Sequence, residues 1–352
     1  MLLKERSRKL SGNIRNRTIA HSRLAATDQP LKSSTPQLRH SGVNFNQMPA
    51  TTLIASRTNP RVKQLRAAFA GHARLSGGLV AIEGEHLLFE AMRSGLDFKT
   101  IFLSASSRPP KWTPPGVEII ELTDEVFASV VDTQTPQGIA ALLAPPAWTL
   151  EDAFPAQRTA LVLVAAGLQD PGNLGTLIRS AEAFGATAVL TTPNTVSEWN
   201  PKAIRASAGS VFRVPVVAVT PAKINALKSP APEPGAPEPA LSLSKGLDSE
   251  TWEGRPKCRG LHLYAAVADD PQQPTALPLI EANLAQPCAL MIGNEGAGLS
   301  EDLLALAGTR ITIPTPGRVE SLNAAIAGSL LLYEASRQRE ASRQRALLTT
   351  TH

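Results

Sequence analysis

Three stretches of the sequence combine glycine or proline turns with polar side chains suited to contacting a substrate. The first is GLQDPGNLGTLIRSAEAFGA, which begins at Gly167, and the second is MIGNEGAGLS, which begins at Met291. The third, ITIPTPGRVESLNAA, begins at Ile311. Each coincides with or follows a short apolar run, and binding sites of parallel α/β sheets gather at the carboxyl ends of strands. The sequence therefore predicts a ligand site built from three strand ends.

The first stretch has the composition of a turn between a strand and a helix. Gly172 and Gly175 are expected to permit tight turning of the backbone, while Asn173 and Thr176 are expected to cap the helix that follows. Arg179 is then expected one turn inside that helix, close enough to the strand ends to meet a phosphate. A capped turn followed by a surface arginine is the alternative interpretation.

The second stretch is rich in glycine. Gly293, Gly296 and Gly298 allow backbone amides and carbonyls to approach a ligand such as adenine or ribose. The spacing differs from the GxGxxG dinucleotide fingerprint, and the stretch lacks the Lys-Ser/Thr pair of a phosphate-binding P-loop. Glu295 in its middle would repel phosphate. A nucleotide polyphosphate is therefore disfavoured as the ligand.

The third stretch opens a predicted helix from Arg318 to Arg339 that is otherwise mostly Ala, Leu and Ile. Either Ser321 or Asn323 is sufficient to cap such a helix. Glu320, Ser321 and Asn323 lie together beside two proline-containing turns, which is more polarity than a cap requires. We interpret this cluster as part of the same site.

Length and composition limit the class of protein. At 352 residues the chain is long enough for two domains, and no apolar run approaches the roughly 20 residues of a membrane helix, so no membrane association is expected. Cys258 and Cys288 supply neither a disulfide framework nor a zinc ligand set, which favours a reducing, cytoplasmic location. The six histidines are scattered, so no metal site is expected.

The net charge of +5 is concentrated at the beginning of the chain. Residues 1–50 hold nine basic and two acidic side chains, a net +7, which leaves about −2 for the other 302 residues. Any RNA affinity of the folded body must therefore come from local patches. We expect 1–50 to be a disordered basic leader: an RNA-tethering tail, a transit-like sequence, or an extension upstream of a true start at Met48.

The remaining pattern predicts two α/β domains. In the first, Val62, Leu65, Ala68 and Phe69 share one face of a helix expected over 59–75, and strands and helices follow to residue 144. In the second, strand-like and helix-like runs alternate, as in a parallel sheet. A proline-rich stretch with an APEP repeat predicts a disordered insertion, and a functional lid is the less favoured alternative. The expected limits are 51–144 for the first domain, 145–158 for a linker, 159–340 for the second domain, 229–260 for the insertion and 341–352 for a tail.

Together these stretches resemble the SpoU/TrmH family of RNA 2′-O-methyltransferases. NLGTLIRSAEAFG, IGNEGAGLS and ITIPTPGRVESLNAAIAGSLLLYEA stand in the order and at the separations of that family, within 159–339. The preceding SRTNPRVKQL and AIEGEHLLFEAM are similar to the RNA-binding domain of members that act on ribosomal RNA. The resemblance implies an α/β parallel sheet with a C-terminal trefoil knot, preceded by a small α/β substrate-binding domain. It also implies a homodimer with the active site near the subunit interface.

The resemblance further implies S-adenosylmethionine (AdoMet) as methyl donor and no metal. Arg179 is implied to contact the target nucleotide. Because a guanidinium does not readily lose a proton, we expect it to orient the 2′-hydroxyl and stabilise developing charge. The implied catalytic residues are Asn173, Arg179, Glu295, Ser321 and Asn323. The implied cofactor-binding residues are Thr191, Thr192, Gly293, Asn294, Gly296, Ile313, Pro314, Leu322 and Asn323.

The implied substrate is RNA, with ribosomal RNA of the 23S type favoured over transfer RNA. A catalytically silent RNA-binding or ribosome assembly factor is the alternative from another class, and a nicotinamide enzyme is disfavoured by the missing fingerprint. A basic segment of the first domain is a candidate to track RNA phosphates, with an ordinary solvated helix face as the alternative. Its residues are Arg57, Asn59, Arg61, Lys63, Arg66 and Arg74.

Overall fold

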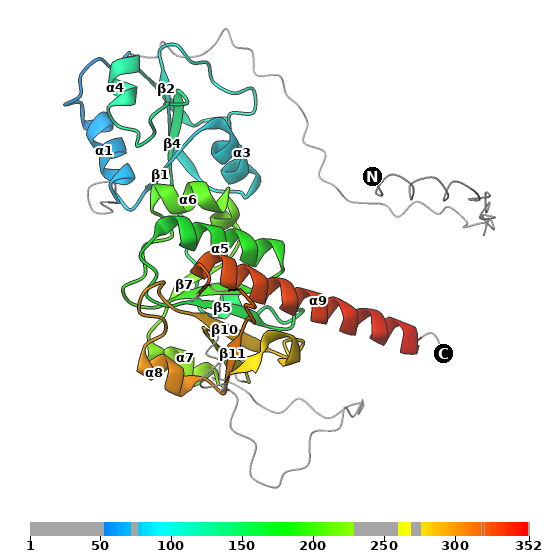
Figure 1. The fold of residues 1–352 in the computed structure, drawn as a ribbon. Helices are drawn as coiled ribbons and strands as arrows, with labels where there is room; N and C mark the ends of the chain where they lie inside the picture. Colours follow the sequence, from blue (N-terminus) through cyan, green and yellow to red (C-terminus); the bar gives the residue numbers. More distant parts are fainter. Residues whose placement is uncertain are drawn as a thin grey trace, which may run out of the picture. The chain divides into compact units, whose positions relative to one another are not determined.

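The computed structural model contains two β-sheets with helices on both faces of each (Figure 1). It describes residues 53–71, 77–228, 260–268, 276–317, 319 and 321–350. The predicted leader and nearly all of the predicted insertion lie outside the described residues, as do Arg74, Arg318 and Glu320. None of the described helices combines the length and apolar character that crossing a bilayer requires.

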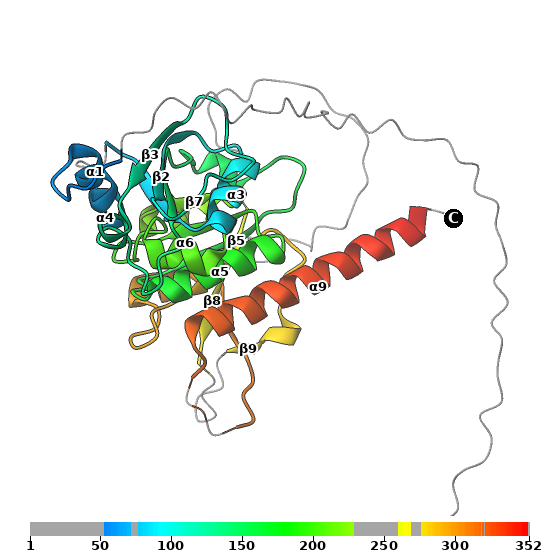
Figure 2. The same ribbon diagram turned by 90° about the horizontal axis from the view of Figure 1, so that it is seen from above.

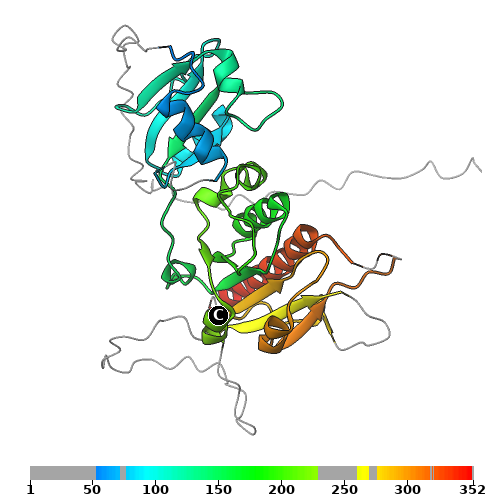
Figure 3. The same cartoon turned by 90° about the vertical axis from the view of Figure 1, so that its left-hand side faces the viewer.

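The first sheet has four strands in the order β1-β4-β2-β3. Strand β4 is antiparallel to both of its neighbours, and β2 is parallel to β3. Figure 3 shows helices on both faces of this sheet. Side chains alternate between the two faces, so that Ile101 and Leu103 pack towards α3 while Phe102 packs towards α1 and α4. The elements are α1 (Pro60–Phe69), β1 (Val80–Glu83), α3 (Glu85–Arg93), β2 (Phe98–Ser104), β3 (Glu118–Leu122), α4 (Asp124–Ala128) and β4 (Ile139–Leu143).

Helix α1 shows how the sequence determines these elements. Asn59 caps it by accepting a hydrogen bond from the backbone N–H of Arg61 at 2.9 Å, and Pro60 occupies the first helical position. The predicted apolar face is confirmed, because all four of its residues are buried: Val62, Leu65, Ala68 and Phe69. This face covers the side of the sheet that presents Phe102.

The second sheet has seven strands in the order β7-β6-β5-β10-β8-β11-β9, and every neighbouring pair is parallel. This confirms the predicted parallel α/β sheet. Strand β10 lies between β5 and β8, although β8 and β9 precede it in the chain. The strands are β5 (Leu161–Ala165), β6 (Ala188–Thr191), β7 (Val216–Ala218), β8 (His262–Val267), β9 (Leu277–Pro278), β10 (Cys288–Ile292) and β11 (Thr309–Thr312). The short β9 was not predicted.

Two helical layers cover this sheet. Leu161 and Leu163 of β5 pack on the side of α5, α6 and α9, while Val162 and Val164 pack on the side of α7 and α8. Helices α5 and α9 run side by side (Figure 2). The helices are α5 (Pro171–Ala183), α6 (Pro201–Ser207), α7 (Pro221–Leu227), α8 (Glu301–Leu306) and α9 (Ala324–Thr350).

Close helix packing explains a glycine that sequence reasoning had assigned to a turn. Gly175 lies inside α5, where an added Cβ would approach the carbonyl oxygen of Ala203 in α6 to 2.3 Å. Gly328 of α9 is similar, since its Cβ would lie 2.4 Å from Leu177 Cδ2. Glycine at these positions lets three helices of one layer pack closely.

The final helix differs from its predicted limits at both ends. It begins at Ala324 instead of Arg318, and it continues to Thr350 through most of the predicted tail. Near its middle, Arg339 donates hydrogen bonds to four backbone carbonyls that lie just before β5 and before β10. The acceptors are Thr159 (2.7 Å), Gln286 (2.8 Å), Ala160 (2.9 Å) and Leu284 (3.0 Å). Arg339 therefore fixes α9 to two central strands.

Replacement of Arg339 by methionine is expected to lower the free energy of unfolding by about 3 kcal/mol, because four carbonyls lose a charged donor. Urea unfolding followed by circular dichroism measures this change. Arg343→Met on the same helix is the matched control. Arg343 is 73% exposed and pairs only with Glu340 among the described residues, so its loss is expected to change stability by less than about 0.5 kcal/mol. Equal stability of the two variants would contradict a fixing role for Arg339.

Candidate active site

The loops that follow three parallel strands meet at Gly167. Its carbonyl accepts a hydrogen bond from Asn294 Nδ2 at 3.1 Å, and its N–H is shared between the hydroxyls of Thr192 (3.1 Å) and Thr195 (3.0 Å). Gly167 follows β5, Asn294 follows β10, and Thr192 follows β6. The carboxyl ends of these strands thus form one connected edge, as the parallel sheet requires.

Asn323, Asn173 and Glu295 form a row of hydrogen bonds across the three predicted stretches. Asn323 Oδ1 caps α9 by accepting from the N–H groups of Ala325 (2.9 Å) and Ile326 (3.2 Å). Its Nδ2 donates to Asn173 Oδ1 at 3.1 Å, and Asn173 Nδ2 donates to the carboxylate of Glu295. We call these three side chains the amide relay.

The amide relay has a fixed polarity, because each amide oxygen accepts and each amide nitrogen donates. It runs from the positive end of the α9 dipole to the negative charge of Glu295, which favours the carboxylate in this position. The structure therefore brings together three of the five predicted catalytic residues. It also shows that Asn323 is more than a cap, since the cap uses only its oxygen.

The predicted beginning of α5 is wrong. The helix begins at Pro171, and Asp170 caps it by accepting from the N–H groups of Gly172 and Asn173, both at 3.3 Å. Asn173 and Thr176 therefore lie inside the helix instead of capping it, and the Thr176 hydroxyl donates back to the Gly172 carbonyl. An aspartate directly before a proline is a known signal for a helix start, and it was overlooked.

Arg179 is separated from the amide relay within one chain. It lies in the third turn of α5, is exposed, and forms no ion pair with the described residues. It lies six positions after Asn173 in the helix, which corresponds to about 240° around the helix and about 9 Å along its axis. No hydrogen bond or ion pair joins Arg179 to the amide relay among the described residues, so their sharing of one site stays a prediction.

The glycine-rich loop after β10 folds tightly on itself. Backbone hydrogen bonds join Asn294 and Gly298 in both directions, at 3.1 and 2.9 Å. The side chain of Asn294 accepts from the N–H groups of Gly296 and Ala297, which gives it a structural role in the loop. A Cβ at Gly293 would lie 2.1 Å from the carbonyl carbon of Gly298, so only glycine fits there.

The other predicted cofactor positions lie at the same strand ends. Thr191 ends β6 and Thr192 follows it, and both are buried, while Ile313 is half-buried after β11. Thr312 precedes Ile313 and has a buried hydroxyl without a hydrogen-bond partner in the described structure. Pro314 and Ser321 are exposed, Leu322 is half-buried, and no hydrogen bond of Ser321 is found among the described residues.

The basic segment around α1 is partly occupied by structural contacts. Asn59 is the helix cap, and Arg61 forms an ion pair with Glu118 at 2.9 Å. Arg57 and Lys63 are exposed, and Arg66 is half-buried. This face therefore offers fewer free cations than the sequence suggested.

Lys202 is a neighbour of the site that sequence reasoning missed. Its ammonium forms an ion pair with Asp170 at 2.7 Å, and this hydrogen bond lowers the pKa of Asp170. The α5 cap therefore remains ionised at neutral pH. No sequence spacing indicated this pair, since it depends on the packing of α6 against α5.

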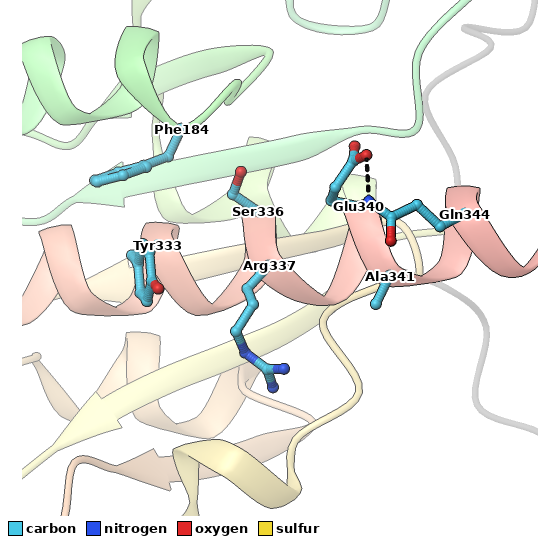
Figure 4. A pocket seen from close by; sticks show the side chains of 7 residues that line it. All are labelled: Phe184, Tyr333, Ser336, Arg337, Glu340, Ala341 and Gln344. Carbon is cyan, nitrogen blue, oxygen red and sulfur yellow. Dashed lines mark hydrogen bonds between the residues drawn. The ribbon is translucent and has the colours of Figure 1, made fainter. Parts of the chain in front are cut away.

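A hollow of about 390 Å³ lies elsewhere, on the outer side of α9 (Figure 4). Phe184 and Tyr333 pack edge-to-face at its end, with ring centroids 5.7 Å apart. Tyr333 is ten residues beyond Asn323, or about 15 Å along the helix. None of the predicted site residues lines this hollow, so we do not assign the chemistry to it. Nor do the described residues contain a cluster of three or more His, Cys, Asp or Glu side chains suited to a metal ion.

Comparison with known proteins shows that the residues of each sheet match a known protein family. Residues 160–232 and 250–333 match the SpoU rRNA Methylase family. Residues 59–141 match the MRM3-like substrate binding domain. The amide relay and the glycine-rich loop lie within the first of these matches.

Individual relatives match this chain over most of their own length. The 23S rRNA (guanosine(2553)-2′-O)-methyltransferase RlmP of Bacillus subtilis is 31% identical over 280 residues, covering 80% of this chain and 97% of the relative. The mitochondrial rRNA methyltransferase 3 of Xenopus laevis is 30% identical and covers 78% of this chain and 72% of its own. The crystal structure of the SpoU methyltransferase AviRb from Streptomyces viridochromogenes, in complex with AdoMet, matches with a TM-score of 0.63 and 25% identity, over 80% of this chain and 98% of that one. The chain belongs to the SpoU rRNA methylase family.

Proposed function

We propose that this protein transfers a methyl group from AdoMet to a ribose 2′-hydroxyl of ribosomal RNA of the large subunit. The amide relay is the observation that carries this proposal, because it joins side chains 122 and 150 residues apart at the end of a parallel sheet. Relatives whose names specify 23S rRNA support ribosomal over transfer RNA as the substrate. An intact relay disfavours a silent binding factor.

The strand ends suit AdoMet better than a phosphorylated cofactor. The loop after β10 brings its backbone close together, and Thr312 has a buried hydroxyl beside Ile313 that is free to contact a ligand. Glu295 offers negative charge, which complements a sulfonium and opposes a phosphate. We assign the cofactor contacts to the residues around Gly293, Ile313 and Leu322. AdoMet supplies an electrophilic methyl group when bound.

The protein must orient the 2′-hydroxyl and stabilise the negative charge that develops on its oxygen. We assign orientation to the amide relay, whose Asn323 and Asn173 hold Glu295 in place. We assign charge stabilisation to Arg179, whose permanently charged guanidinium is a poor base but a good partner for an oxyanion or an adjacent phosphate. Ser321, exposed directly before α9, is the remaining candidate to align either group.

A homodimer would bring the separated groups together. Ile326, Leu330 and Tyr333 are spaced four and three residues apart on α9, and their exposed fractions are 55%, 40% and 53%. Such an apolar face is suited to a second copy of the chain. We propose that the partner subunit's Arg179 approaches the amide relay across this face. We further propose a trefoil knot, which is supported by the position of β10 between β5 and β8. We also propose a cytoplasmic location.

Methyl transfer from labelled AdoMet into unmodified ribosomal and transfer RNA tests the function. Label in ribosomal RNA, mapped to an alkali-resistant nucleotide, is the expected result. Label in transfer RNA alone would mean that transfer RNA, and not ribosomal RNA, is the substrate. AdoMet binding without transfer to either RNA would favour a silent factor.

Asn173→Asp tests the amide relay, because it replaces the donor to Glu295 with a second carboxylate of the same shape. At pH 8 we expect about tenfold slower transfer. Two adjacent carboxylates raise the pKa of one of them, so a shared proton restores the hydrogen bond as the pH falls. The rate relative to wild type should therefore recover towards pH 6. Asn173→Ala cannot regain a donor, and the same recovery in that variant would contradict the relay.

A further inference from the structure

Side chains of α3 and of the loop after β2 form an aromatic and basic patch. Helices α3 and α1 lie on opposite faces of the four-stranded sheet (Figure 1). Phe89 of α3 and Trp112 of the loop after β2 pack edge-to-face, with ring centroids 5.7 Å apart and an interplanar angle of 61°. The guanidinium carbon of Arg93 lies 5.9 Å from the centre of the Phe89 ring. Arg108 and Lys111, both exposed, precede Trp112 in the same loop. We call these five residues the α3 platform.

The loop holds Trp112 in a defined position. Thr113 donates two hydrogen bonds to the carbonyl of Pro110, from its N–H at 3.1 Å and its hydroxyl at 2.7 Å. The indole packs partly against the core, and both Trp112 and Phe89 are half-buried, which leaves part of each ring accessible. A ring fixed in this way loses little conformational entropy when it binds a ligand.

The charge around the platform is positive. Residues 105–117 contain two cations and no acidic side chain. Two acids of α3 lie near the platform. Glu90 has a side chain that is only 13% exposed and is paired with Arg213 at 2.8 Å and with Arg93 at 3.5 Å. Glu85 is exposed one turn before Phe89. The two loop cations, Arg108 and Lys111, form no ion pair with the described residues, so a ligand at the loop side of the platform meets unpaired positive charge beside the rings.

The α1 face lacks this combination. Its arginine Arg61 is paired with Glu118, Asn59 is used as a cap, and its aromatic residue Phe69 is buried. The basic segment suggested by the sequence therefore has charge without a stacking group. Aromatic rings together with cations are what proteins use to bind unpaired bases, whereas duplex RNA is contacted mainly through its backbone.

We propose that the α3 platform binds a single-stranded segment of the substrate RNA, with an unpaired base stacked on Trp112 and the flanking phosphates contacting Arg108 and Lys111. This inference rests on the proposed function for the identity of the RNA. It assigns the substrate contact of the first sheet to α3 and the following loop, and not to α1.

Fluorescence anisotropy of the full chain tests the platform, with a labelled unstructured RNA of about 12 nucleotides and a duplex of the same length as probes. Trp112→Leu is expected to weaken single-strand binding about tenfold, and to change duplex binding less than about twofold. Trp112→Phe should retain most of the affinity. The double variant Arg108→Gln and Lys111→Gln should weaken binding. It should also lower the slope of log affinity against log salt concentration by the equivalent of about two phosphate contacts.

The matched control is Arg61→Gln with Lys63→Gln on α1, which removes the same charge from the opposite face. Thermal unfolding verifies that each variant is folded. If Trp112→Leu is unstable, the double variant of Arg108 and Lys111 still tests the platform, because both side chains are exposed. Wild-type affinity in both platform variants, or a loss confined to the α1 variant, would overturn the inference. If the platform variants lose single-strand binding but the wild type transfers no methyl group, the platform is supported and the proposed function is refuted.

Discussion

Replacement of Arg179 by alanine is expected to lower kcat for methyl transfer by at least about 100-fold, while the Kd for AdoMet changes by less than about twofold. Arg179 is exposed on α5 and forms no ion pair with any described residue, so its loss leaves no buried group without a partner. The expected loss is therefore one of transition-state stabilisation and not of folding. Single-turnover transfer and calorimetric titration of AdoMet measure the two quantities separately.

Two further variants make this result specific. Arg179→Lys retains the charge but not the planar fork that binds phosphate in a bidentate manner, so an intermediate rate is expected. Arg343→Ala removes an exposed arginine of α9 and should leave both kcat and the Kd unchanged. A kcat of Arg179→Ala within about threefold of wild type would refute its catalytic role.

Mixing two inactive variants tests whether Arg179 acts across a subunit interface. If the site combines Arg179 of one subunit with the amide relay of the other, a dimer of Arg179→Ala and Asn323→Ala chains contains one complete site. Random exchange of equal amounts should then restore about one quarter of the wild-type activity. If activity does not recover after subunit exchange has been verified, Arg179 and the amide relay of the same subunit form the site.

Much of the fold follows from local sequence signals. The buried face of α1 was predictable from apolar spacing, and the strands of both sheets from short apolar runs between turns. The beginning of α5 was predicted too late in the chain, since Asp170 and not Asn173 or Thr176 caps the helix. Helix α9 extends beyond its predicted end, since its polar second half resembles a tail and is fixed by Arg339 through contacts distant in sequence.

The arrangement of the site was only partly predictable. Residue types and strand ends indicated that Asn173, Glu295 and Asn323 belong together. Their hydrogen bonds depend on β10 lying beside β5, and no local pattern specifies that strand order. Helix α5 begins before Asn173, so Asn173 and Arg179 lie in the same helix. Six helix positions place their side chains on different faces of it.

Replacement of Gly293 by alanine is expected to weaken AdoMet binding by at least about 30-fold, the second large effect that this structure predicts. The backbone of Gly293 does not require a positive φ, so the cost is purely steric. An added Cβ would lie 2.1 Å from Gly298 C and 2.3 Å from Leu299 N. Backbone atoms at these distances cannot rotate away, and the loop after β10 must open.

Gly296→Ala is the matched control within the same loop. Its Cβ would approach nothing closer than Asn294 Oδ1 at 3.5 Å, an ordinary contact, so AdoMet affinity and melting temperature should stay near those of wild type. Opening of the loop in Gly293→Ala should also move Glu295 away from Asn173, so that kcat falls at saturating AdoMet together with affinity. Calorimetry of both variants separates a local steric effect from a general sensitivity of the loop to side chains. Wild-type affinity in Gly293→Ala would mean that this loop does not form the cofactor pocket, and the site would then have to be assigned to the ends of β6 and β11 alone.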